Sequence, residues 1–116
     1  VERTDTPFTN RFQPGQVIRL PIAHNEGRYT ADAKTLREIG SQVVFRYCNS
    51  EAQVTAASNP NGSLRAIAGI CNVGGNVLGM MPHPDRCAEE VLGNAQGRRI
   101  FDSIVYAWEL ARRQRI

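Results

Sequence analysis

The chain has 116 residues, 41% of them hydrophobic, and a net charge of +3 from thirteen Arg and one Lys against eleven acidic residues. This length suits one small domain or part of a larger one, and no apolar run approaches the ~18 residues of a membrane-spanning helix. The chain opens with the polar run VERTDTPF, which has no secretory signal, and its three widely spaced cysteines are read as reduced cytosolic thiols, so we expect a cytoplasmic protein that does not bind membranes.

The first half of the chain predicts two strands around a short helix. Residues 15–24 read as a strand because apolar residues alternate there, although Pro21 cannot donate to a ladder. After a turn at NEGRY, residues 30–42 predict a short helix with Gly40 at its stop. The run QVVFRYCN, residues 42–49, is the clearest strand, since it is rich in β-branched and aromatic residues. A polar loop follows it.

The second half predicts a hairpin and a long helix. Residues 64–71 and 76–82 flank the turn NVGG, which is typical of a β-hairpin. One or two helical turns over residues 87–93 precede a strong amphipathic helix over residues 95–115. We expect that helix to pack on the sheet through its apolar stripe, which consists of Ile100, Phe101, Ile104, Val105 and Trp108. The order of elements predicts an α/β or α+β layer with a partly antiparallel sheet.

The stiff corner PHPD ends the hairpin and carries the strongest candidate for chemistry. Pro82 and Pro84 restrict the backbone on both sides of His83. Asp85 stands two residues on, where a carboxylate can orient the imidazole as a general base. The same carboxylate can instead cap the short helix that follows. The three residues alone do not decide between these two interpretations.

A nucleophile is harder to find. Cys71, in GICNVGG, follows a predicted strand, but Val73 stands where a nucleophile elbow needs Gly, and a turn and a strand follow instead of a helix. We expect neither a helix dipole nor a cation to activate this thiol, so Cys71 is interpreted as a strand-end thiol. Cys87, close to His83 in sequence, is a weaker second candidate.

Signs of nucleic-acid and metal binding are weak. The Arg residues are scattered except for RR at 98–99 and RRQR at 112–115, and the latter ends a predicted helix, where cations complement the dipole. No C-x-x-C pair occurs, and the two His do not stand at zinc-finger offsets. We expect no bound metal and no nucleic acid. An Arg-rich nucleic-acid binder is kept as an alternative, which steep salt dependence of DNA binding would reveal.

Several short segments of the sequence match one enzyme family. NVLGMMPHPDR resembles the final signature of class I glutamine amidotransferase domains, in which a strand ends in His-Pro-Glu. TPFTNRF, IRLPIAHNEGRY, VVFRYCN and NPNGSLRAIAGICN extend the resemblance in order, from about Thr6 to Trp108. Together they resemble the branch of that family that forms the glutaminase subunits of phosphoribosylformylglycinamidine synthases.

The resemblance implies a fold larger than this chain. Residues 1–116 correspond to the C-terminal portion of a single flavodoxin-like amidotransferase domain, with a mixed sheet, an antiparallel hairpin and a C-terminal helix. The nucleophilic cysteine and the parallel strands of the family lie upstream of this portion. That arrangement explains why the core predicted from these residues is thin.

The resemblance also implies roles for individual residues. His83 falls on the catalytic His of a Cys-His-acid triad, and Asp85 falls on its Glu, one methylene shorter. His24 and Glu26, in AHNEGRY, match a word near the active-site rim, which implies a substrate or interface role. A structural turn, with Glu26 bonded to backbone beside Gly27, is the alternative reading of these two residues.

The implied activity is hydrolysis of glutamine to glutamate and ammonia for purine biosynthesis. The implied partners are a synthase subunit and a small accessory subunit. ATP and Mg²⁺ belong to the synthase, and no cofactor is expected here because the sequence has no phosphate-binding G-x-x-x-x-G-K-[ST] loop. The isolated chain is expected to be inactive. The alternative function is a non-catalytic interaction module derived from an amidotransferase.

Overall fold

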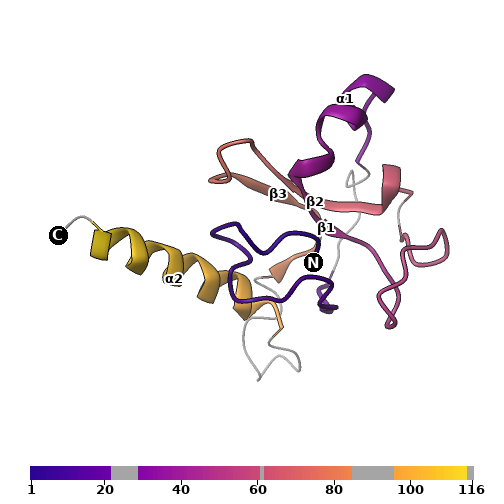
Figure 1. The fold of residues 1–116 in the computed structure, drawn as a ribbon. Coiled ribbons are helices and arrows are strands. Elements are labelled where there is room, and N and C mark those ends of the chain that lie inside the picture. The colour runs from indigo at the N-terminus through magenta and orange to yellow at the C-terminus, as the bar shows by residue number, and fades with distance from the viewer. Residues whose placement is uncertain (22–28, 61, 85–95, 115–116) are drawn as a thin grey trace.

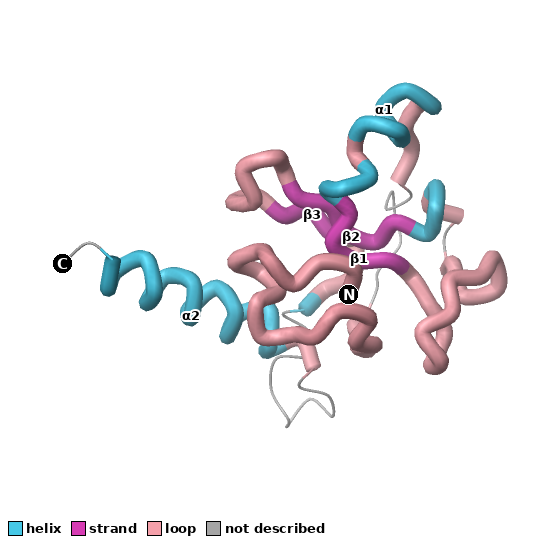
Figure 2. Tube along the Cα trace, viewed as in Figure 1, coloured by secondary structure: helices cyan, strands magenta, loops and turns pink. Residues whose placement is uncertain are grey.

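A computed structural model describes residues 1–21, 29–60, 62–84 and 96–114 (Figure 1). In chain order its elements are α1 (Ala33–Glu38), the 3₁₀ turn η1 (Gly40–Gln42), β1 (Val43–Arg46), the 3₁₀ turn η2 (Leu64–Ala66), β2 (Ile67–Cys71), β3 (Leu78–Met80) and α2 (Arg98–Gln114). Figure 2 shows that loops wrap around this small sheet and form much of the body.

The sheet has three strands in the order β1-β2-β3, and both pairs are antiparallel. Val43 lies opposite Ile70 in the first pair, and Gly69 lies opposite Met80 in the second. The predicted strands and their neighbour relations are confirmed, although each is shorter than expected. The described part of the sheet is wholly antiparallel, so the parallel strands of a mixed sheet stay a prediction.

The β2–β3 hairpin turns where NVGG predicted. The side-chain oxygen of Asn72 accepts the backbone N–H groups of Asn76 and Val77, each at 3.0 Å. Gly75 takes a φ of +74°, a left-handed conformation that glycine adopts without a Cβ penalty. An Asn side chain that substitutes for backbone partners is the turn chemistry expected of this residue type.

The expected strand at residues 15–24 is wrong for its described part, residues 15–21, which join no strand of the described sheet. The N–H of Arg19 donates to the side-chain oxygen of Gln96 at 2.8 Å, and Pro21 has no N–H to give. Ile18 and Leu20 nevertheless pack against the core. The alternation of apolar residues therefore predicted correctly which side chains pack against the core, but it wrongly predicted that this segment pairs with a strand.

Helix α1 is shorter than the predicted helix over residues 30–42. Asp32 caps it, with a side-chain oxygen accepting the N–H of Thr35 at 2.7 Å. The α-helix ends at Glu38, and the chain continues through η1 from Gly40. The stop near Gly40 is thus confirmed, while the last turn is 3₁₀ rather than α.

The core lies on the sheet and is closed from one side by the start of α2. It is formed by Phe12, Val44, Phe45, Ala68, Cys71 and Ile100. Gly69 sits where β2 is crowded, because a Cβ there would lie 3.0 Å from the Phe45 ring and 3.1 Å from the Met80 Cβ. This close approach explains a glycine inside a strand.

The expectation that α2 packs on the sheet along its whole apolar stripe is wrong. Ile100 is buried, but Phe101 is 41% and Trp108 is 59% exposed. Ser103, fully buried, anchors the helix: its carbonyl accepts the Asn10 amide at 2.8 Å and its hydroxyl accepts the Arg11 N–H at 3.1 Å. The Arg11 guanidinium also lies over the Tyr106 ring, 4.6 Å from its centroid. Beyond that contact the helix projects away from the body (Figure 1), and the stripe residues after Ile100 are 38–59% exposed.

Candidate functional site

The His83 corner is held by backbone hydrogen bonds at one end of the sheet. After β3, the N–H of Met81 donates to the carbonyl of Ala68 at 3.1 Å, and Pro82 is buried. The N–H of His83 then donates to the carbonyl of Pro21 at 2.7 Å. Because β2 and β3 are antiparallel, His83 lies at the end of the sheet where β2 begins. Asp85, the expected orienter, lies outside the described residues.

His24 and Glu26 also lie outside the described residues, but the residues on either side of that stretch are placed. Pro21 accepts the bond from His83. Tyr29 makes two bonds to the segment before β2: its N–H donates to the Ser63 hydroxyl at 3.2 Å, and its carbonyl accepts the Leu64 N–H at 3.0 Å. Both flanking residues are therefore fixed at the His83 end of the sheet.

Cys71 lies at the opposite end. It pairs with Leu78, the first residue of β3, whereas His83 follows the last. Met81 is bonded to Ala68, which lies three extended residues, roughly 10 Å, from Cys71 along β2, and His83 lies beyond Met81. A nucleophile and its base need contact at about 3 Å. Cys71 is therefore not the nucleophile that His83 would serve. This agrees with the sequence analysis, which interpreted Cys71 as a strand-end thiol.

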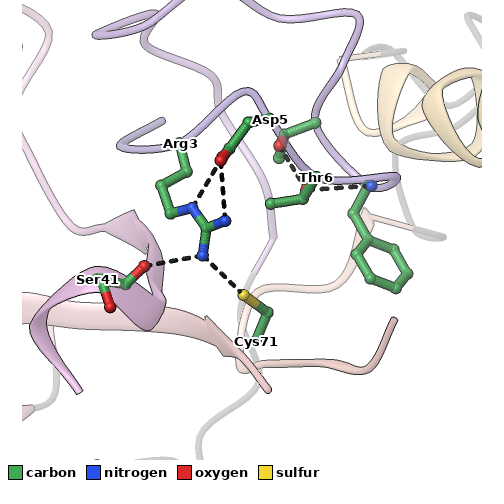
Figure 3. A network of polar contacts seen from close by, with 7 residues as sticks. Arg3, Asp5, Thr6, Ser41 and Cys71 are labelled. Atoms are coloured by element: carbon green, nitrogen blue, oxygen red, sulfur yellow. Dashed lines mark hydrogen bonds and ion pairs between the residues drawn. The ribbon is translucent and has the colours of Figure 1, made fainter. Parts of the chain in front are cut away.

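The surroundings of Cys71 differ from the expectation in one respect: a cation is present (Figure 3). The Arg3 guanidinium donates to the Cys71 sulfur at 3.4 Å and, from the same nitrogen, to the Ser41 carbonyl at 2.8 Å. Its other nitrogens form a two-point pair with Asp5, at 2.8 and 3.0 Å. Sequence reasoning missed Arg3 because its partners Ser41 and Cys71 are distant in the chain.

The Arg3–Asp5 ion pair shifts the pKa of each group in the direction that favours its charged form. Hydrogen bonding to Asp5 raises the pKa of Arg3 above its ordinary value, and the hydrogen bond from Arg3 lowers the pKa of Asp5. Cys71 is itself 2% exposed. The network therefore joins the N-terminal segment, η1 and the end of β2, and it leaves the thiol shielded from solvent. This is the arrangement of a structural contact.

Cys48 is the described cysteine on the His83 side. It lines a mainly apolar cavity of about 190 Å³ together with Pro82, the residue before His83. Within the described ranges, no group of three or more His, Cys, Asp or Glu could hold a metal ion. The helices placed in the structure are all too short or too polar to cross a membrane.

Comparison with known proteins supports the amidotransferase resemblance. The model of the CobB/CobQ-like glutamine amidotransferase domain matches residues 1–108. Curated relatives include the phosphoribosylformylglycinamidine synthase subunit PurQ of Moorella thermoacetica, 57% identical over 97% of this chain and 49% of the relative. The same subunit of Gloeobacter violaceus is 56% identical over 90% of this chain and 46% of the relative.

A solved structure agrees. A chain of PurLQS from Thermotoga maritima superposes with a TM-score of 0.73 at 44% identity, covering 93% of this chain and 44% of that one. The chain thus spans about half the length of the proteins it matches. At this identity and coverage, the likeness extends beyond the fold to the sequence.

Proposed function

Since the chain belongs to the CobB/CobQ-like glutamine amidotransferase family, we propose that it forms part of the glutaminase component of a phosphoribosylformylglycinamidine synthase. The protein would hydrolyse glutamine to glutamate and ammonia for purine biosynthesis. The observation that carries the proposal is the family match over residues 1–108, which includes the whole His83 corner. The corner itself, a half-buried imidazole on a backbone fixed from both sides, suits a general base.

The proposed reaction is acyl transfer to a thiol. His83 takes the proton of the thiol, the resulting thiolate attacks the side-chain amide carbon of glutamine, the C–N bond breaks, and His83 gives that proton to the departing ammonia. His83 then takes a proton from water, whose oxygen attacks the thioester carbon; the C–S bond breaks, glutamate leaves, and His83 returns the proton to the thiolate. Asp85 holds the imidazole in the tautomer that both steps need. His24 and Glu26 contribute substrate or interface contacts.

The thiol is proposed to come from a part of the amidotransferase domain outside this sequence. Cys71 lies at the wrong end of the sheet, and the relatives have about twice the length. We propose accordingly that residues 1–116 are the C-terminal portion of one flavodoxin-like domain with a mixed sheet. The exposed stripe of α2 supports this, since an apolar helix face normally packs against another element.

The proposed partners follow from the same assignment. The relatives are named as subunits of a synthase, and the Thermotoga maritima structure is of PurLQS. We infer that the protein passes ammonia to a synthase subunit, beside a small accessory subunit, in the cytoplasm. ATP and Mg²⁺ would be bound by the synthase, and this chain would need no cofactor.

Replacing His83 by Ala tests the function. In the longest natural chain that contains this sequence, assayed with its synthase, His83→Ala should abolish glutamine-dependent synthesis and leave ammonia-dependent synthesis largely intact. The reason is that His83 serves only ammonia release. Unchanged glutaminase activity in His83→Ala would show that the base is assigned wrongly. Wild-type protein that docks the synthase but never hydrolyses glutamine would support the interaction-module alternative.

A further inference from the structure

The backbone around His83 is anchored on two sides, and the two anchors differ in kind. On one side the N–H of Met81 donates to the Ala68 carbonyl of β2, which is itself held by strand ladders on both edges. On the other side the N–H of His83 donates to the Pro21 carbonyl at 2.7 Å. Pro21 ends residues 18–21, the 18–21 segment, which joins no strand of the described sheet. The position of this second anchor therefore depends on how the 18–21 segment is packed.

Two apolar side chains of the 18–21 segment pack against the body of the protein. Ile18 and Leu20 are half-buried and contact the core that includes Phe45 and Ala68. Leu20 adjoins Pro21 in the chain, so its packing bears most directly on the carbonyl that accepts the His83 bond.

Leu20 also lines the mainly apolar cavity of about 190 Å³ that reaches Pro82, the residue before His83. Phe45 of β1 and Met80 of β3 contribute to the same wall. A site that borders open space relaxes more readily when a side chain is truncated than a densely packed site does. Shortening Leu20 would therefore let the 18–21 segment shift, and the Pro21 carbonyl would shift with it.

We propose that Leu20 is a positioning residue for His83, which acts through the Pro21 carbonyl. The proposal rests on the proposed glutaminase function and deepens it, because it names an apolar residue that sets where the base stands. Leu20 takes no part in proton transfer. Its packing fixes the acceptor of the His83 N–H, and thereby the place from which the imidazole meets the thiol and the departing ammonia. Such geometry acts on the chemical steps rather than on the binding of glutamine.

The test compares Leu20→Ala with Leu20→Met in the longest natural chain that contains this sequence, in complex with its synthase. Because a misplacement of about 1 Å can cost a hundredfold in rate, Leu20→Ala should lower kcat for glutamine hydrolysis roughly ten- to a hundredfold, with the KM for glutamine nearly unchanged. Leu20→Met conserves the side-chain volume and should restore most of kcat. Ammonia-dependent synthesis should not change in either variant.

Leu78→Ala is the matched control. Leu78 is also half-buried and packs against the same core, but it lies opposite Cys71, at the far end of β3 from His83. Its truncation removes the same atoms as Leu20→Ala and should leave kcat close to that of the wild type.

Hydrogen exchange at the His83 amide gives a measurement that does not depend on activity. Neither proline of the Pro82–His83–Pro84 sequence has an N–H, so His83 supplies its only backbone amide. Exchange there should be faster in Leu20→Ala than in the wild type and unchanged in Leu78→Ala. If Leu20→Ala does not fold, the smaller truncation Leu20→Val takes its place under the same criteria.

Three results would overturn the positioning role: wild-type exchange at His83 in the truncated Leu20 variant, an equal loss of kcat in the Leu20 and Leu78 truncations, or a Leu20→Met variant as slow as Leu20→Ala. A wild-type protein without glutaminase activity would instead overturn the proposed function. The exchange at His83 would still show whether Leu20 holds its anchor.

Discussion

His83 and Pro21 are joined by the hydrogen bond from the His83 N–H to the Pro21 carbonyl, at 2.7 Å. This bond links the candidate base to a segment more than sixty positions away in the chain. It also uses the only backbone N–H of the Pro82–His83–Pro84 sequence, since neither proline has one. The backbone of the base is thereby set independently of its side chain, and the proposed role of Asp85 is to orient the imidazole.

Substitutions at Asp85 should report that orientation. Asp85→Asn should lower glutamine turnover, because an amide does not hold the imidazole tautomer as a carboxylate does. Asp85→Glu should be tolerated or increase turnover, since it restores the acid of the resembled signature. Steady-state glutaminase assays on the longest natural chain measure both. A Glu variant as impaired as the Asn variant would contradict the role of Asp85.

The crowding at Gly69 predicts a loss of stability. Gly69→Ala would place a Cβ 3.0 Å from the Phe45 ring and 3.1 Å from the Met80 Cβ, so β3 or the Phe45 side chain must move. Such overpacking typically costs about 1–3 kcal/mol in the free energy of unfolding. Urea unfolding measures it. Gly79→Ala, in β3 with open space around the new Cβ, is the matched control and should be nearly neutral.

The Arg3–Asp5 pair predicts a pH dependence. The pKa of Asp5 is lowered in the folded state, so its stabilisation is present above its unfolded pKa of about 4 and is lost as pH falls through the lowered value. The Asp5 side chain is 71% exposed, so we expect less than about 1 kcal/mol. Wild type and Asp5→Asn should therefore differ in unfolding free energy at pH 6 and converge in acid.

A matched exposed carboxylate controls for general charge effects. Asp102→Asn removes a longer contact, 3.9 Å to Arg98 on α2, and should change stability less than Asp5→Asn at pH 6. A constant difference between wild type and Asp5→Asn from pH 6 down to pH 2 would show that the contribution of Asp5 does not come from its charge.

Labelling should separate Cys71 from a catalytic thiol. An electrophilic glutamine analogue should not modify Cys71 selectively, because Cys71 is 2% exposed and lies far from His83. A small general thiol reagent should modify the half-buried Cys48 faster than Cys71. Peptide mapping by mass spectrometry measures both. Stoichiometric labelling of Cys71 that glutamine prevents would mean that Cys71 is the nucleophile.

Trp108, the only tryptophan, reports what covers α2. In the 116-residue chain its indole is 59% exposed, so acrylamide should quench its fluorescence efficiently. In the longest natural chain the proposed remainder of the domain should cover the stripe, shift the emission to shorter wavelength and reduce quenching. If the fluorescence of Trp108 itself is quenched equally in both chains, the proposed domain arrangement is contradicted.

The strands were predictable because their signals are local. QVVFRYCN and the hairpin around NVGG carry β-branched residues and turn formers at the right spacing, and the structure places β1, β2 and β3 there. The cap of α1 at Asp32 is likewise a local effect. Such features depend on neighbours a few residues away, which the sequence displays directly.

Other features were not predictable because they depend on distant partners. The stripe on α2 was read correctly as a helix face, but amphipathicity does not say what will cover it. Arg3 reaches Cys71 from the other end of the chain, and Ser63 reaches Tyr29 across more than thirty positions. Of the candidate site, only His83 falls within the described residues, so the roles of His24, Glu26 and Asp85 stay predictions.

The attachment of α2 to the body near its start alone has a mechanical consequence. The contacts there join Ser103 to Asn10 and Arg11, and place the Arg11 guanidinium over the Tyr106 ring, 4.6 Å from its centroid. Beyond Tyr106 the helix runs for about 12 Å, at 1.5 Å per residue. It is therefore a lever that pivots at these contacts, and a tilt of about 10° there displaces the far end by about 2 Å. Whatever element seats against Phe101 and Trp108 sets the angle of this lever.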